Sequence, residues 1–282
     1  MSTVDLATKP SLLSGLGRAV RSELRKFFTT RMWWGMGIAV LLSGAAFSTL
    51  FGFLYTSQGF LDQASAGQPV EFTPIQLANS VYTAGLSVGY LLLLTIGVIQ
   101  VGSEYRHKTI TATFLAIPHR ARVMLAKVIA LLILGAGYGV VSLLGSVTLG
   151  ALVLQLRDRE AFPSDSVFRT LALSLLVLGL WALIGLGIGI LIPNQVAALL
   201  IGVGVAWIVE PLIAFGLQFW DFGRGHIAPY LPSQATTAIV DSVQSSANEV
   251  RLDWWQGALA LAAWAAVLAG FGIWRTVRQD VS

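Results

Sequence analysis

Six long apolar stretches, separated by shorter polar ones, dominate the pattern along the chain. A predominantly apolar helix of about 20 residues is long enough to cross a hydrocarbon core roughly 30 Å thick. The pattern therefore predicts an all-α integral membrane protein with six transmembrane helices in a single domain, residues 1–282. The predicted spans are residues 32–54, 80–101, 123–154, 169–192, 195–216 and 257–274.

A different pattern precedes the first span. At about 100° per residue, the apolar residues of 12–28 fall on one arc of a helix. Arg18, Arg21 and Arg25 lie just beyond that arc, and Glu23 is the one charged residue that falls on it. The pattern predicts an amphipathic helix in the membrane interface. A transit peptide or a cleaved signal peptide is the alternative, but the next apolar stretch is too long for one and has no small-residue cleavage pattern.

Three connecting segments are predicted to be outer loops, namely residues 56–79, 155–168 and 217–256. The first has no Lys or Arg, the second balances its two arginines with three acids, and the third has only two Lys or Arg. The third contains apolar pieces too short to span, of which 235–243 is one. They predict re-entrant or interfacial helices before the last span. Spans four and five are joined only by Pro193 and Asn194, which predicts a tight hairpin.

Two G-x-x-x-G spacings occur within the spans, at Gly135–Gly139 and Gly185–Gly189. Such spacings let a neighbouring helix backbone approach closely. The sequence leaves open whether they mark a specific helix contact or loose packing within the chain.

Composition supports the membrane interpretation, since 55% of the 282 residues are hydrophobic and only 11% are charged, against about a quarter in soluble domains. The net charge of +4 does not predict a nucleic-acid partner, because the cations lie beside the apolar spans and form no basic face. There is no cysteine, and the three histidines His107, His119 and His226 have no metal-ligand spacing. We therefore expect no metal site.

The cations are distributed unevenly. Of the 18 Lys and Arg residues, 13 fall in the N-terminal segment, in residues 102–127 and in the C-terminal tail, and five fall in the predicted outer segments and at their edges. Cytoplasmic loops carry the excess of Lys and Arg. Both termini are therefore predicted to be cytoplasmic, in a multi-pass protein of the plasma membrane.

Residues 102–122 form the long polar, cation-rich segment between spans two and three. Within it, Ile110, Phe114 and Ile117 recur at i, i+4 and i+7, which gives a short helix one apolar stripe. Pro118 ends this helix, because the residue before a proline avoids the helical region. The segment is predicted to carry a short amphipathic helix at the cytoplasmic surface, where another protein can dock.

This segment also resembles a known family. Glu104-x-Arg106-x-x-Thr109, followed by the sequence FLAIP at 114–118, is similar to the E-x-R-x-x-T…L-x-x-P pattern of ABC-2 type permeases, the membrane subunits of one class of ATP-binding-cassette exporters. The alternative is a solvated loop in which Glu104 and Lys108 form an i, i+4 ion pair worth a few tenths of a kcal/mol.

The resemblance implies an N-terminal elbow helix, short helices before the last span, and two permease subunits, expected to be a homodimer, with two ATP-binding-cassette ATPase subunits in a bacterial membrane. It makes 102–122 the coupling loop. The residues expected to couple to the ATPase are Glu104, Arg106, Thr109, Ile110, Phe114 and Ile117.

No G-x-x-x-x-G-K-[ST] motif occurs in the chain, and such a motif is what cradles nucleotide phosphates in a P-loop. ATP and Mg are therefore expected in the partner, with no cofactor and no catalytic residue in this chain. The apolar, weakly charged spans favour export of a lipophilic or amphipathic substrate, such as a drug, antibiotic, peptide or lipid.

Glu210 is the one clear acid inside a span, and an ionisable residue at membrane depth suggests a function. We favour a structural role over substrate contact, because Pro211 follows and the carboxylate can reach the outer interface. A secondary transporter or channel is the main alternative function, although no internal repeat is visible. A membrane-embedded enzyme would use Glu210, Asp221 and His226 as acid and base, but no G-x-S-x-G motif accompanies them.

Overall fold

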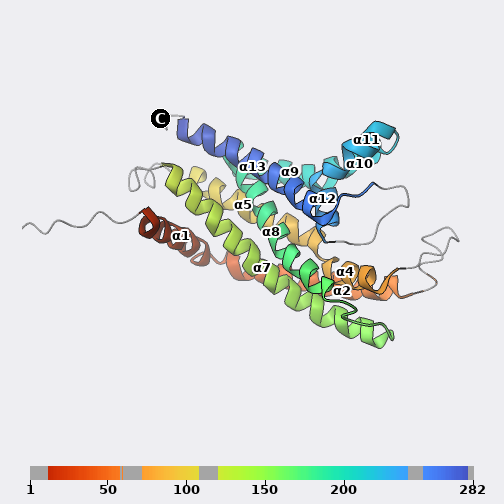
Figure 1. Cartoon of the computed structure of the whole chain (residues 1–282). Coiled ribbons are helices and arrows are strands. Elements are labelled where there is room, and N and C mark those ends of the chain that lie inside the picture. Colours follow the sequence, from red (N-terminus) through yellow and green to blue (C-terminus); the bar gives the residue numbers. More distant parts are fainter. Residues whose placement is uncertain (1–11, 58, 60–71, 108–119, 241–249, 279–282) are drawn as a thin grey trace, which may run out of the picture.

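The computed structural model describes residues 12–57, 59, 72–107, 120–240 and 250–278. In this part of the chain all regular structure is helical (Figure 1). Six helical stretches are long and apolar enough to cross a membrane, which confirms the predicted six-span helical architecture. They are α2 (Met32–Tyr55), α4 with α5 (Pro74–Thr83 and Leu86–Arg106), α7 (Arg120–Leu156), α8 (Ser166–Leu191), α9 to α10 (Gln195–Leu217) and α13 (Trp254–Arg278).

Helix α8 is the centre of the packing. It contacts α5, α7 and α13, while α2 packs along the other side of α7. Trp181 of α8 is fully buried and stacks on Tyr90 of α5, with ring centroids 4.2 Å apart. The amphipathic helix α1 (Leu12–Phe28), at the predicted range, lies against α7 (Figure 1).

The glycine spacings mediate close helix contacts within the chain. A Cβ added to Gly135 of α7 would lie 2.5 Å from the Cα of Gly179 in α8, and one added to Gly185 would overlap the backbone of Leu94 in α5. Gly137, in contrast, has nothing within 4 Å of an added Cβ. These glycines therefore let α8 approach α7 and α5 at backbone distance.

The second span begins earlier than predicted, so the assignment of 56–79 as an outer loop is wrong at its end. Helix α4 starts at Pro74, where the Thr73 hydroxyl accepts a hydrogen bond from the Gln76 N–H and the Gln76 side chain accepts one from the Thr73 N–H. This capping box starts a helix even where the following residues are polar. The chain then breaks at Ala84 and Gly85 before α5 begins.

The remaining differences concern the ends of helices. Helix α7 extends to 120–156 where 123–154 was predicted, and α13 begins at Trp254 and not at 257. In the described residues of the predicted outer segment, 217–240 and 250–256, there are three short helices, and the last of them packs on α8 and α13. They are α11 (Asp221–His226), η2 (Ala228–Tyr230) and α12 (Pro232–Ile239).

The fifth span contains a wide turn. Asn194 caps its start by accepting hydrogen bonds from the N–H groups of Val196 and Ala197. Residues Val205–Val209 form a π-helical turn, η1, directly before Glu210 and Pro211. Proline has no N–H and its ring clashes with the carbonyl four residues earlier in a regular helix, so the wider turn accommodates Pro211. Large apolar side chains are exposed along this span, including Leu200, Trp207, Leu212 and Phe215.

The cation-rich segments gather at one end of the bundle. Helix α1, the start of α7 and the end of α13 lie together in Figure 1, and α4 and α11 lie at the opposite end. These helix ends, each of which carries cations, therefore lie at the same end of the bundle.

Candidate functional site

Four charged side chains meet where α1 lies against the ends of α5 and α7. Lys127 of α7 donates hydrogen bonds to Glu23 of α1 at 2.7 Å and to Glu104 of α5 at 2.8 Å. Lys26 of α1 donates to the same two carboxylates, at 2.7 Å and 2.8 Å. We call these four residues the ion cluster. It joins three helices through four charge-assisted hydrogen bonds.

Most of the ion cluster is removed from solvent. The side chain of Lys127 is 0% exposed, and those of Glu23 and Glu104 are 4% and 8% exposed, whereas Lys26 remains 43% exposed. A buried charge is tolerated when it is paired and hydrogen-bonded. Two acids and two lysines balance each other here, so the cluster has no net charge.

The electrostatics of α1 follow from this pairing. Burial on its own would raise the pKa of Glu23, but attraction to Lys127 and hydrogen bonds to Lys127 and Lys26 outweigh it and lower the pKa. Burial would lower the pKa of Lys26, yet its hydrogen bonds to Glu104 and Glu23 raise it. Both groups are therefore held in their charged forms.

The ion cluster explains the charged residue on the apolar arc of α1. Glu23 faces the protein because its partner Lys127 lies at the buried start of α7. Sequence reasoning grouped Lys127 with the cytoplasmic cations and missed its role. An acid on an apolar face together with a lysine inside an apolar stretch is the signal that could have paired them.

A small pocket of about 140 Å³ opens beside the ion cluster. Glu23, Lys26 and Glu104 line it, together with Gln100 and Ser103 of α5. Both polar atoms of the Gln100 side chain are buried and have no hydrogen-bond partner among the described residues. The pocket thus extends the polar region along α5.

The structure separates the two charged residues of the E-x-R pattern. Glu104 is buried in the ion cluster, whereas Arg106 is exposed on the last turn of α5. Arg106 lines a pocket of about 510 Å³ with the hairpin residues 193–196. The other four predicted coupling residues, Thr109, Ile110, Phe114 and Ile117, lie outside the described residues.

Glu210 connects the fifth span to α12. It is 5% exposed, and its carboxylate accepts a hydrogen bond of 2.5 Å from the backbone N–H of Ser233. Ser233 is in the first turn of α12, where N–H groups lack partners within the helix and a negative charge is favourable. This contact ties the fifth span to the start of α12.

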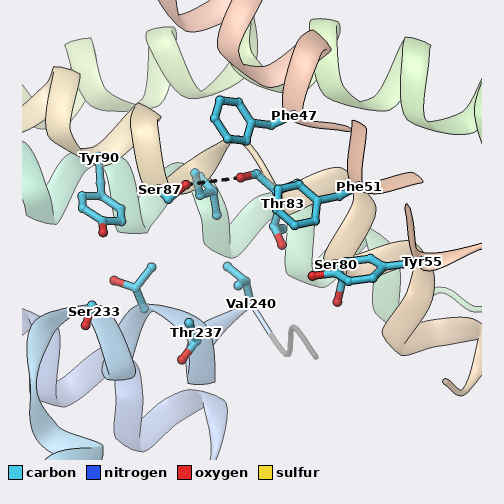
Figure 2. A pocket seen from close by; sticks show the side chains of 13 residues that line it. Phe47, Phe51, Tyr55, Ser80, Thr83, Ser87, Tyr90, Ser233, Thr237 and Val240 are labelled. Carbon is cyan, nitrogen blue, oxygen red and sulfur yellow. Dashed lines mark hydrogen bonds between the residues drawn. The ribbon is translucent and has the colours of Figure 1, made fainter. Parts of the chain in front are cut away.

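A second pocket, of about 270 Å³, lies near the other end of the bundle (Figure 2). Rings from α2 form one wall, and hydroxyl groups from α4, α5 and α12 form the others. No Asp, Glu, Lys, Arg or His is among its lining residues in the described part of the chain. They are Phe47, Phe51, Tyr55, Ser80, Thr83, Ala84, Leu86, Ser87, Tyr90, Ser233, Thr236, Thr237 and Val240.

The residues considered for an enzyme have separate partners. Asp221 forms an ion pair with Arg224 at 2.8 Å, and His226 stacks on Phe222 with ring centroids 4.6 Å apart. Glu210 is buried and bonded to Ser233. Over the described ranges, no group of three or more His, Cys, Asp or Glu residues is arranged to hold a metal ion.

Comparison with known proteins does not place the chain in a family, since no protein-family model and no curated protein sequence matches it.

Proposed function

We propose that this chain is the permease subunit of an ATP-binding-cassette exporter of the ABC-2 type. In this proposal it moves a lipophilic or amphipathic substrate out of the cytoplasm or inner leaflet. ATP hydrolysis in a separate subunit drives the movement. The E-x-R-x-x-T pattern at 104–109 and the gathering of cation-rich segments at one end of a six-span bundle support it.

The observation that carries the proposal is the position of Glu104 in the ion cluster. Residues 107–119 connect the end of α5 to the start of α7, and Glu104 and Lys127 tie those two helices together at 2.8 Å. Glu23 links the same lysine to α1 at 2.7 Å. A force applied to the connecting segment would therefore reach three helices together.

The proposed assembly contains two copies of this chain and two ATPase subunits in a bacterial plasma membrane, with the termini of this chain in the cytoplasm. Arg106 and the apolar stripe of Ile110, Phe114 and Ile117 would contact the ATPase. The exposed apolar face of the fifth span would face lipid or the second permease subunit. ATP and Mg would bind only to the ATPase subunits.

Co-purification tests this proposal. The tagged chain is co-expressed with candidate ATP-binding-cassette ATPases of the same organism, and one of them is expected to remain bound through purification. Phe114→Asp should abolish the association, because it places a charge in the apolar contact. Phe162→Asp changes a half-exposed ring in the connection between α7 and α8 and should leave the association intact.

Two outcomes would contradict the proposal. One is that no ATPase subunit binds the chain. The other is substrate flux by the purified chain alone in liposomes under an ion gradient, which would favour a secondary transporter or channel.

A further inference from the structure

We infer that the 270 Å³ pocket between α2, α4, α5 and α12 binds an uncharged amphipathic molecule with a ring-sized apolar part and a polar part that donates hydrogen bonds. The inference rests on the proposed function in one respect, because it would give the exporter its substrate class. Binding itself requires only this chain.

The aromatic wall of the pocket suits an apolar ring. Phe47, Phe51 and Tyr55 follow one another at i, i+4 and i+8 on α2, so they lie on one face of the helix. Their ring centroids are 6.2 Å and 5.3 Å apart in sequence order, and Figure 2 shows them along the top and right of the pocket. Aromatic surfaces of this kind favour flat apolar groups.

The lining disfavours a charged ligand. None of its residues carries an ammonium, guanidinium, imidazole or carboxylate group. The carboxylate of Glu210 is directed to the backbone N–H of Ser233. Two charged groups contact the lining, and both are already paired there, since Glu210 accepts from the Ser233 N–H and Arg251 donates to the Thr237 carbonyl. An ion that entered would therefore lose hydration without an unpaired opposite charge beside it, which is unfavourable.

The hydroxyl groups favour a ligand that donates hydrogen bonds. Thr83 donates its hydroxyl hydrogen to the carbonyl of Asn79 at 2.7 Å, and Thr237 donates to that of Gln234 at 2.8 Å. Thr236 donates to the carbonyl of Pro232 at 2.8 Å and already accepts one hydrogen bond from the Trp181 indole N–H at 2.9 Å, which leaves it one lone pair. A hydroxyl has one hydrogen and two acceptor lone pairs, so these oxygens present acceptors. A ligand that donates hydrogen bonds can use these acceptors.

The size of the pocket limits the ligand further. Pockets for drug-sized ligands usually measure about 300–1,000 Å³, and this one, at about 270 Å³, lies just below that range. It can hold one aromatic ring with a polar group of similar size, such as a single sugar. A folded peptide or a whole lipid would be too large.

Three matched probes test the inference by equilibrium dialysis against the purified chain in phosphatidylcholine nanodiscs. Phenyl β-glucoside is uncharged and has hydroxyl donors, its tetra-O-methyl ether has none, and phenyl phosphate is charged. Saturable binding of the glucoside, with the other two at least tenfold weaker, is expected. Equal binding of all three, or no saturable binding of the glucoside, would overturn the inference.

Variants locate the site. Thr237→Val removes an acceptor without changing the shape of the side chain, and it should weaken glucoside binding about threefold to tenfold. Thr148→Val is the control, because Thr148 makes the same kind of intrahelical hydrogen bond on α7, away from the pocket. If Thr237→Val binds the glucoside as tightly as the parent protein, or if Thr148→Val loses as much affinity as Thr237→Val, the glucoside binds elsewhere and the proposed site is refuted.

The outcome is separable from that of the proposed function. Absence of an ATPase partner would leave glucoside binding unaffected. Absence of glucoside binding would leave ATPase association unaffected.

Discussion

The ammonium of Lys127 lies 2.7 Å from the carboxylate of Glu23, although the two residues are 104 positions apart in the sequence. The lysine side chain in this pair is fully buried. The contact fixes an amphipathic helix to the start of a spanning helix. Glu104 completes the link by bonding to the same lysine from α5. The end of the bundle that carries the cation-rich segments is therefore joined internally by charge.

Removing Lys127 should destabilise the protein strongly. Lys127→Met leaves Glu23 and Glu104 buried without their fully enclosed partner, and breaking a buried ion pair costs about 3–5 kcal/mol. Thermal unfolding of the purified protein should show a large decrease in midpoint. Lys26→Met should cost much less, because the Lys26 side chain is 43% exposed and exposed pairs contribute about 0–1 kcal/mol.

A double variant tests whether the pair is the cause. The double variant Glu23→Gln, Lys127→Met should lose less free energy of unfolding than the sum of the losses in the two single variants. The reason is that the second change removes a charge that the first left unpaired. Additive losses would show that the two residues act independently and contradict the ion cluster.

Stability should depend on pH through Glu23. Its pKa in the folded protein lies below the ordinary value of 4.5, so its stabilising effect is present above pH 4.5 and is lost as the pH falls through the folded-state value. The pKa of Lys26 lies above 10.5, so its contribution is present below pH 10.5 and is lost as the pH rises through the folded-state value.

Thermal midpoints across the acid range check this dependence. The difference in thermal midpoint between the parent protein and the Glu23→Gln variant should be constant above about pH 4.5 and should shrink at lower pH. Glu160→Gln, a change at an exposed acid, is the control and should differ little from the parent throughout. A pH-independent difference for Glu23→Gln would be inconsistent with a lowered pKa.

The six spans could be predicted because each is long and apolar, so composition alone identifies them. The start of α4 could not be predicted in the same way, since Gln76 and Asn79 have the polarity of a loop. Burial of Asn79 at 1% exposure and the cap at Thr73 make the segment helical. The break at Gly85 coincides with a close approach to Gly44 in α2, a contact between segments distant in sequence.

Glycine substitutions should separate helix contacts from loose packing. Gly135→Ala places a methyl group 2.5 Å from the Cα of Gly179, and forcing such overlap typically costs about 1–3 kcal/mol or more. Gly137→Ala, two residues away, meets nothing within 4 Å and should be neutral or slightly stabilising. Thermal unfolding of both variants distinguishes the two cases, and equal effects would contradict the described packing of α7 on α8.

Glu210 should behave as a structural residue. Glu210→Ala removes the acceptor for Ser233 N–H and should cost about 0.5–2 kcal/mol, as for loss of a helix cap, while Glu210→Gln keeps an acceptor and should cost less. Thermal unfolding measures the loss. A change in substrate preference with unchanged stability in Glu210→Gln would show substrate contact instead.

The candidate site was only partly predictable. Glu104 and Arg106 were identified by their spacing, but the spacing could not show that one is buried and the other exposed. Lys127 was read as a surface cation because a lysine at the start of an apolar stretch usually lies at the membrane edge. Lys127 is buried because the fold brings Glu23 of α1 next to it, and no local sequence pattern predicts this contact.

ATP hydrolysis by the purified complex, compared with the free ATPase subunit, tests the coupling proposal most directly. Arg106→Ala changes an exposed side chain and should leave co-purification and thermal stability intact, yet remove the effect of the permease on the hydrolysis rate. Arg159→Ala, exposed in the connection between α7 and α8, should behave as the parent. Undiminished coupling and transport in the double variant Glu104→Ala, Arg106→Ala would contradict the account.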